Sequence, residues 1–98
     1  MWEHTDKQAY DLRKIKVLIV DDSMMFADFM AKSVASDPAL EVVGIAANPF
    51  EARDMILKYR PDVMTLDIEM PRMDGLEFLQ RLMPQYPIPV VMVSALSD

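Results

Sequence analysis

Residues 15–22, IKVLIVDD, place a short aliphatic run directly before two aspartates. Such a run, rich in β-branched side chains, is typical of a strand that is buried on both faces of a parallel sheet. Asp21 and Asp22 would then follow the strand and lie outside the hydrophobic core. Ligands of open α/β sheets bind at the carboxyl ends of the strands, so these two acids mark a candidate site.

A second group of acids follows a later aliphatic run. Residues 63–66, VMTL, are followed by Asp67 and, two positions further on, by Glu69. If the two strands are neighbours, the carboxylates of Asp21, Asp22 and Asp67 converge on one small cleft. An acid pair after one strand is often only a helix cap, but the whole combination favours a functional site.

The predicted cluster suits a hard divalent cation. Neighbouring carboxylates raise each other's pKa, and a bound cation relieves that repulsion. The ligands are all oxygen, the chain has no cysteine and its one histidine is His4, so Mg²⁺ or Mn²⁺ fits better than zinc. Beside such a metal, the carboxylate of Asp67 can act as a nucleophile toward a phosphoryl group and form an aspartyl phosphate.

Strand and helix signals alternate along the chain. We predict strands at 15–20, 41–46, 63–66 and 88–93, and helices at 23–34, 49–60 and 76–83. Short connections between alternating elements imply a parallel sheet with right-handed crossovers and helices on both faces. Asp22 or Ser23 is available to cap the first helix, and Asn48 with Pro49 begins the second.

Helical spacing also predicts which side chains face the core. These are the apolar residues of the three helices, namely Phe26, Phe29, Met30 and Val34, then Ala52, Met55, Ile56 and Tyr59, and finally Leu76, Leu79, Leu82 and Met83. The turn before the third helix ends in Asp74 and Gly75, and we expect Gly75 to supply a backbone geometry that other residues resist.

Composition limits the function classes. A chain of 98 residues is one domain at most. It has no cysteine for disulfides and no apolar run near the roughly 18–20 residues of a membrane span. Its net charge of −6 argues against nucleic-acid binding. Residues 1–14 lack a secretory signal pattern, so we expect an N-terminal extension and a cytoplasmic location.

Three motifs together resemble the receiver domain of response regulators. They are Asp21-Asp22, the run DIEMPRMDG at residues 67–75, and Ser94-Ala95. Within that family, residues 69–79 and 91–97 are most similar to the amino-terminal receiver of chemotaxis protein-glutamate methylesterases of the CheB type. The resemblance covers residues 15–98 and implies a flavodoxin-like (CheY-like), doubly wound parallel α/β sheet.

The resemblance implies a role for each site residue. Asp67 would be the phosphoacceptor in a two-component phosphorelay. Asp22, Asp67 and the backbone carbonyl of Glu69 would ligate Mg²⁺, while Asp21 would hold a metal-bound water. Ser94 would be the switch hydroxyl that bonds the phosphoryl group. The implied phosphodonor is a CheA-like histidine kinase.

The same resemblance implies a regulatory chain and not an enzyme. In a longer parent protein, a methylesterase effector domain acting on chemoreceptors would follow. A serine hydrolase needs a base beside its nucleophile, but the only histidine is His4, and no nucleophile-elbow glycine pattern surrounds Ser94 or Ser97.

Receivers of this fold have five strands in the order 2-1-3-4-5, and residues up to Asp98 account for four. We therefore expect an incomplete, truncated receiver sheet at 15–98, without the lysine that follows the fifth strand in the family. Residues 90–93 would form an apolar edge, which predicts self-association.

Two other classes of function remain open from the residues alone. A small Mg²⁺-dependent phosphohydrolase would use the same carboxylates, but it would turn over a phosphomonoester many times. A protein-interaction module that is never phosphorylated would show no response to magnesium.

Overall fold

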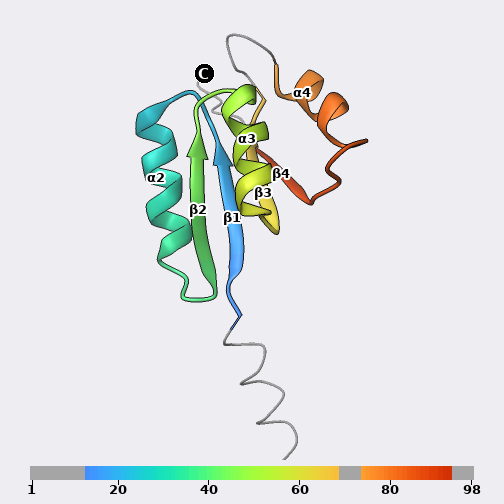
Figure 1. The fold of residues 1–98 in the computed structure, drawn as a ribbon. Coiled ribbons are helices and arrows are strands. Elements are labelled where there is room, and N and C mark those ends of the chain that lie inside the picture. The colour runs from blue at the N-terminus through green and yellow to red at the C-terminus, as the bar shows by residue number, and fades with distance from the viewer. Residues whose placement is uncertain (1–12, 69–73, 94–98) are drawn as a thin grey trace, which may run out of the picture.

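The computed structural model describes residues 13–68 and 74–93, in which strands and helices alternate (Figure 1). The elements are β1 (Ile15–Val20), α2 (Met24–Ala35), β2 (Leu40–Ala46), α3 (Pro49–Tyr59), β3 (Val63–Asp67), α4 (Gly75–Leu82) and β4 (Val90–Val93). The described strands pair in parallel in the order β2-β1-β3-β4. This confirms the predicted doubly wound α/β class. Apart from residues 13 and 14, the extension predicted at 1–14 lies outside the described residues.

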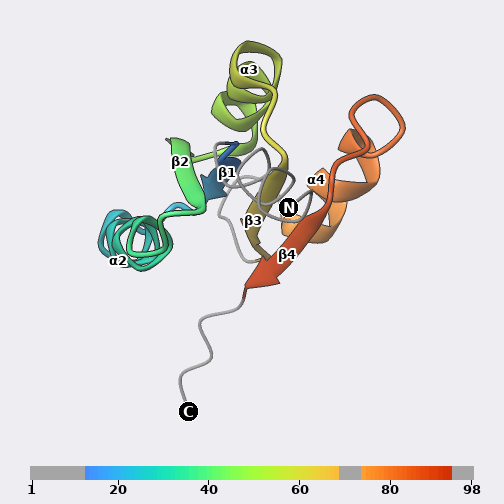
Figure 2. The ribbon, with the colours of Figure 1, turned by 90° about the horizontal axis from the view of Figure 1, so that it is seen from below.

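Helices cover both faces of the sheet. Figure 2 shows α2 on one side, with α3 and α4 on the other. Alternate residues of a strand point to opposite faces, so β1 contributes to two cores. Val17 and Ile19 pack with Ala27 of α2, whereas Leu18 and Val20 pack on the side of α3 and α4. This burial on both faces explains why the first strand reads as a continuous aliphatic run.

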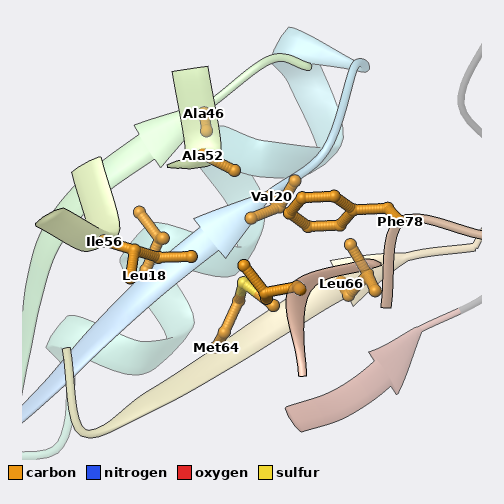
Figure 3. Close-up of a cluster of buried hydrophobic side chains, with 9 residues drawn as sticks. Leu18, Val20, Ala46, Ala52, Ile56, Met64, Leu66 and Phe78 are labelled. Atoms are coloured by element: carbon orange, nitrogen blue, oxygen red, sulfur yellow. The ribbon is translucent and has the colours of Figure 1, made fainter. Parts of the chain in front are cut away.

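The larger core lies between the sheet and the pair α3 and α4 (Figure 3). Leu18, Met64 and Leu66 are fully buried in it, and the ring of Phe78 reaches from α4 toward Val20. The remaining members are small or aliphatic, namely Ala46, Ala52, Ile56 and Leu82. Both central strands, β1 and β3, therefore contribute side chains to the same core.

Two of the predicted helix faces are wrong in part. Phe29 is 62% exposed and Leu76 is 58% exposed, while Phe78, which the pattern omitted, is only 5% exposed. In α2, Ala27 is buried, and Met30, Ala31 and Val34 pack beside it. A single apolar period fits two adjacent stripes of a helix, and contact with the sheet selects one of them.

Local capping explains where the helices begin. Ser23 caps α2, because its hydroxyl accepts from the N–H of Phe26 at 3.2 Å. In α3 the Asn48 side chain accepts from the N–H groups of Phe50 and Glu51 at 3.0 and 2.9 Å. The Glu51 carboxylate accepts in turn from the N–H of Ala47 at 2.8 Å. These contacts satisfy amide groups that have no partner within the helix.

Hydrogen bonds of Lys16 connect the amino end of β1 to the residues that precede β3. Its N–H donates to the Asp62 carboxylate at 2.8 Å, and its carbonyl accepts from the N–H of Asp62 at 2.8 Å. The Lys16 ammonium also donates to the carbonyl of Tyr59 at 2.8 Å. The register of β1 against β3 is therefore held by side chains as well as by the strand ladder.

On the sheet's β4 side, Val91 is 54% and Met92 41% exposed. The self-association predicted from this strand stays a prediction. In the part of the chain that the structure describes, no helix is long and apolar enough to cross a membrane.

Candidate functional site

Three aspartates meet at the carboxyl ends of β1 and β3. Asp21 and Asp22 follow β1, and Asp67 is the last residue of β3. One carboxylate oxygen from each lies within 4.8 Å of the other two. The strands bring them together because β1 and β3 are parallel neighbours, with Val20 opposite Leu66. The predicted convergence of these three acids is therefore confirmed.

Asp21 differs from the expectation that both acids lie outside the core. Only 6% of it is exposed. Its carboxylate accepts from the N–H of Ser23 at 2.8 Å, and its own N–H donates to the carbonyl of Ala46 at 2.9 Å. A buried carboxylate requires such partners, and the bond to Ser23 ties Asp21 to the turn that starts α2.

The pKa of Asp22 is raised by its place in the cluster. Loss of water contact raises its pKa, and the pKa is raised further by the hydrogen bond that a protonated Asp22 donates to Asp67 and by the charge of Asp67, against a smaller lowering by its own backbone. The Asp22 side chain remains exposed, and the neighbouring carboxylate of Asp67 favours its protonated form. A divalent cation between these oxygens would relieve the repulsion.

Backbone contacts hold the end of β3 on two sides. The N–H of Ile68 donates to the carbonyl of Val93 at 3.2 Å, and the N–H of Gly75 donates to the carbonyl of Ile68 at 2.8 Å. Asp74 caps α4, because its carboxylate accepts from the N–H of Glu77 at 2.7 Å. The strand end that carries Asp67 therefore contacts both β4 and the start of α4.

Two predicted site residues lie outside the described residues. These are Glu69, expected to offer its backbone carbonyl to a metal, and Ser94, expected to be the switch hydroxyl. Their predicted roles stay predictions. The sequence interpretation did not foresee the contact between Gly75 and Ile68, since only the helical start itself was visible in the pattern.

A groove of about 210 Å³ lies elsewhere, between α3 and α4. It is lined by Pro49, Phe50, Arg53, Phe78, Arg81, Leu82, Gln85 and Tyr86. The three aspartates are not among these residues, so the acid cluster at the carboxyl ends of β1 and β3 is separate from this groove.

The sequence from residue 17 to residue 98 matches the family model described as the response regulator receiver domain. The chain belongs to the response regulator receiver family. The receiver sheet seen here, in the order β2-β1-β3-β4, with acids at the ends of β1 and β3, agrees with that membership.

Curated relatives narrow the type of receiver. The chain is 67% identical over 87 residues to a protein-glutamate methylesterase/protein-glutamine glutaminase 2 of Syntrophomonas wolfei. It is 60% identical over 86 residues to a protein-glutamate methylesterase/protein-glutamine glutaminase of Syntrophotalea carbinolica. These matches cover 89% and 88% of this chain but only 26% and 24% of the relatives. This receiver therefore spans about a quarter of the length of the methylesterases that it resembles.

Solved structures agree with the sequence relatives. The response regulator domain of Thermotoga maritima CheB superposes with a TM-score of 0.80 at 41% identity, over 88% of this chain and 64% of that one. One chain in the crystal structure of the P1 domain of CheA3 in complex with CheY6, from R. sphaeroides, superposes with a TM-score of 0.74 at 36% identity. The match covers 86% of this chain and 66% of that one. The chain is thus a CheB-like receiver in sequence and in fold.

Proposed function

We propose that this receiver accepts a phosphoryl group on Asp67 from a CheA-like histidine kinase, with Mg²⁺ as cofactor. The observation that carries the proposal is the meeting of Asp21, Asp22 and Asp67 within 4.8 Å at the strand ends of a receiver fold. Receiver chemistry needs one carboxylate as nucleophile and others beside it to hold a cation, and this cluster supplies both.

The residues present fit a hard divalent cation. Asp22 and Asp67 are the carboxylates that would ligate Mg²⁺, with Asp21 holding a bound water and Glu69 contributing its backbone carbonyl. The pKa of Asp22 is raised beside Asp67, and a bound cation would lower it again by favouring the charged carboxylate. Mg²⁺ or Mn²⁺ would neutralise charge on the oxygens of the transferring phosphoryl group.

In the proposed phosphoryl transfer, Asp67 is the nucleophile and its neighbours position it. A carboxylate oxygen of Asp67 attacks phosphorus, a P–O bond forms, and the P–N bond to the donor histidine breaks, after which that nitrogen takes a proton. The hydrogen bonds of Ile68 to Val93 and Gly75 fix the backbone next to the nucleophile. Ser94 is proposed to bond the new phosphoryl group and so change the surface beyond β4.

We infer the partners from the relatives. The complex of the P1 domain of CheA3 with CheY6 supports a CheA-like kinase as donor. The methylesterase relatives support a longer parent protein in which this module regulates a methylesterase domain. We propose in addition that the parent is located in the cytoplasm and that its methylesterase domain acts on chemoreceptors. In that scheme residues 15–98 are regulatory, residues 1–14 precede the domain, and the chain itself catalyses no ester hydrolysis.

Intact-mass spectrometry after incubation with Mg²⁺ and acetyl phosphate tests the proposal. We expect one phosphoryl adduct that disappears in Asp67→Asn and when EDTA replaces Mg²⁺. Asp28→Asn is the matched control, since Asp28 pairs with Lys32 on the exposed face of α2, and it should keep the adduct.

Two outcomes would contradict the proposal. An adduct that survives Asp67→Asn would place the acceptor elsewhere. Release of many phosphates per chain from a phosphomonoester would indicate a phosphohydrolase instead. No contact among the described residues favours that second activity.

A further inference from the structure

Gly75 is the first residue of α4, and it lies against the backbone that follows β3. A Cβ atom built on Gly75 would lie 2.5 Å from the Cα of Ile68 and 2.7 Å from the backbone oxygen of Asp67. It would also lie 3.2 Å from the carbonyl carbon of Ile68. All three atoms belong to the main chain, so rotation of a side chain cannot relieve the contact.

The reason for glycine here is space and not an unusual dihedral angle. Among the described residues no glycine has a positive φ, so the backbone geometry expected from the sequence is not what Gly75 provides. Instead the missing Cβ lets its N–H approach the carbonyl of Ile68 and donate to it at 2.8 Å. The start of α4 is therefore bonded directly to the residue after Asp67.

We propose that Gly75 is a positioning residue for the acid cluster, because it allows α4 to lie against the Asp67–Ile68 peptide. The inference rests on the proposed function of Asp67. Any side chain at Gly75 must push α4 away or move the end of β3. Movement of the end of β3 displaces the carboxylate of Asp67 from Asp21 and Asp22, and a displacement of about 1 Å at a reacting group can cost about 100-fold in rate.

The experiment compares Gly75→Ala with Gly44→Ala. Gly44 is a matched control, because its added Cβ would meet chiefly the Met55 sulfur at 2.9 Å, the flexible part of a side chain in the core. Mg²⁺ affinity is measured by calorimetry, and the phosphorylation rate with acetyl phosphate by intact mass. Both are measured at a temperature where circular dichroism shows each variant to be folded.

We expect Gly75→Ala to weaken Mg²⁺ binding by about 10-fold or more and to slow phosphorylation by up to about 100-fold. Gly44→Ala should change neither quantity. A Gly75→Ala chain that melts earlier but keeps both quantities would overturn the inference, because its role would then be structural only. An unsubstituted chain that neither binds Mg²⁺ nor forms the adduct would instead overturn the proposed function and this inference with it.

If Gly75→Ala does not fold, Asp74→Ala decides the question. That change removes the bond to the N–H of Glu77 and loosens the start of α4 without adding an atom near Ile68. We expect a slower phosphorylation rate that Asp74→Asn, which keeps a capping oxygen, restores. Unchanged kinetics in Asp74→Ala would contradict a positioning role for the start of α4.

Discussion

At the amino end of β1, the backbone of Lys16 exchanges hydrogen bonds with the carboxylate and the N–H of Asp62, whereas at the carboxyl end of the same strand Asp22 faces a second carboxylate, Asp67. The same two strands, β1 and β3, supply both ends. At the first, hydrogen bonds hold the register. At the second, like charges are brought together at a cost in stability, which is the usual arrangement where a protein holds a ligand.

The comparison predicts that substitutions at the carboxyl end of β1 change Mg²⁺ affinity, whereas substitutions at its amino end change the free energy of unfolding. The largest effect should come from Asp22→Asn, which removes one of three clustered carboxylates. We expect Mg²⁺ affinity to fall by more than the roughly 10-fold typical of an outer-shell partner. Isothermal titration calorimetry measures it, with Asp62→Asn as the control at the other end. Equal affinity in Asp22→Asn would remove Asp22 from the metal site.

A smaller effect is expected from Asp62→Ala. The change leaves the N–H of Lys16 without its carboxylate acceptor, although water can reach the site. We expect the free energy of unfolding to fall by about 1 kcal/mol, measured by urea denaturation, with Mg²⁺ affinity unchanged. Weakened Mg²⁺ binding in this variant would show that the two ends are coupled and that the comparison is too simple.

The smallest effect concerns pH in metal-free protein. Because the folded state raises the pKa of Asp22 above its ordinary value of 3.8, the folded chain holds this proton more tightly than the unfolded chain does. The resulting loss of stability is present above the raised pKa and disappears as the pH falls through it toward 3.8.

Asp22→Asn should therefore melt at a higher temperature than the unsubstituted chain at neutral pH, and this difference should shrink as the pH is lowered. Thermal melts in EDTA at a series of pH values measure it. Asp28→Asn is the control, because Asp28 faces Lys32 at 3.0 Å and not another acid. A difference that is independent of pH would show that repulsion from Asp67 is not its cause.

The sequence predicted those features that depend on neighbours along the chain. Strand 15–20, the cap Asn48, and the alternation of strands and helices all follow from local pattern, which also limited the cap of α2 to Asp22 or Ser23. The acids were predictable too, because strand ends of a parallel sheet share an edge.

What the sequence left open depends on contacts between distant segments. The choice of Phe78 over Leu76 as the buried residue of α4 depends on where the sheet lies. The proximity of Gly75 to the Asp67–Ile68 peptide depends on how α4 leaves β3. Both are set by tertiary packing. A hydrophobic period or a turn signal in the sequence does not distinguish between alternative packings.

The pairing of β1 with β3 has a further consequence, for the order of events during folding. The contact between Lys16 and Asp62 spans 46 residues, and α2, β2 and α3 lie within that loop. Closing so long a loop lowers the entropy of the chain before the contacts between β1 and β3 can compensate with favourable free energy. The acid cluster therefore comes into existence only with the long-range architecture, so a chain that has folded locally but not globally has no assembled phosphoacceptor site.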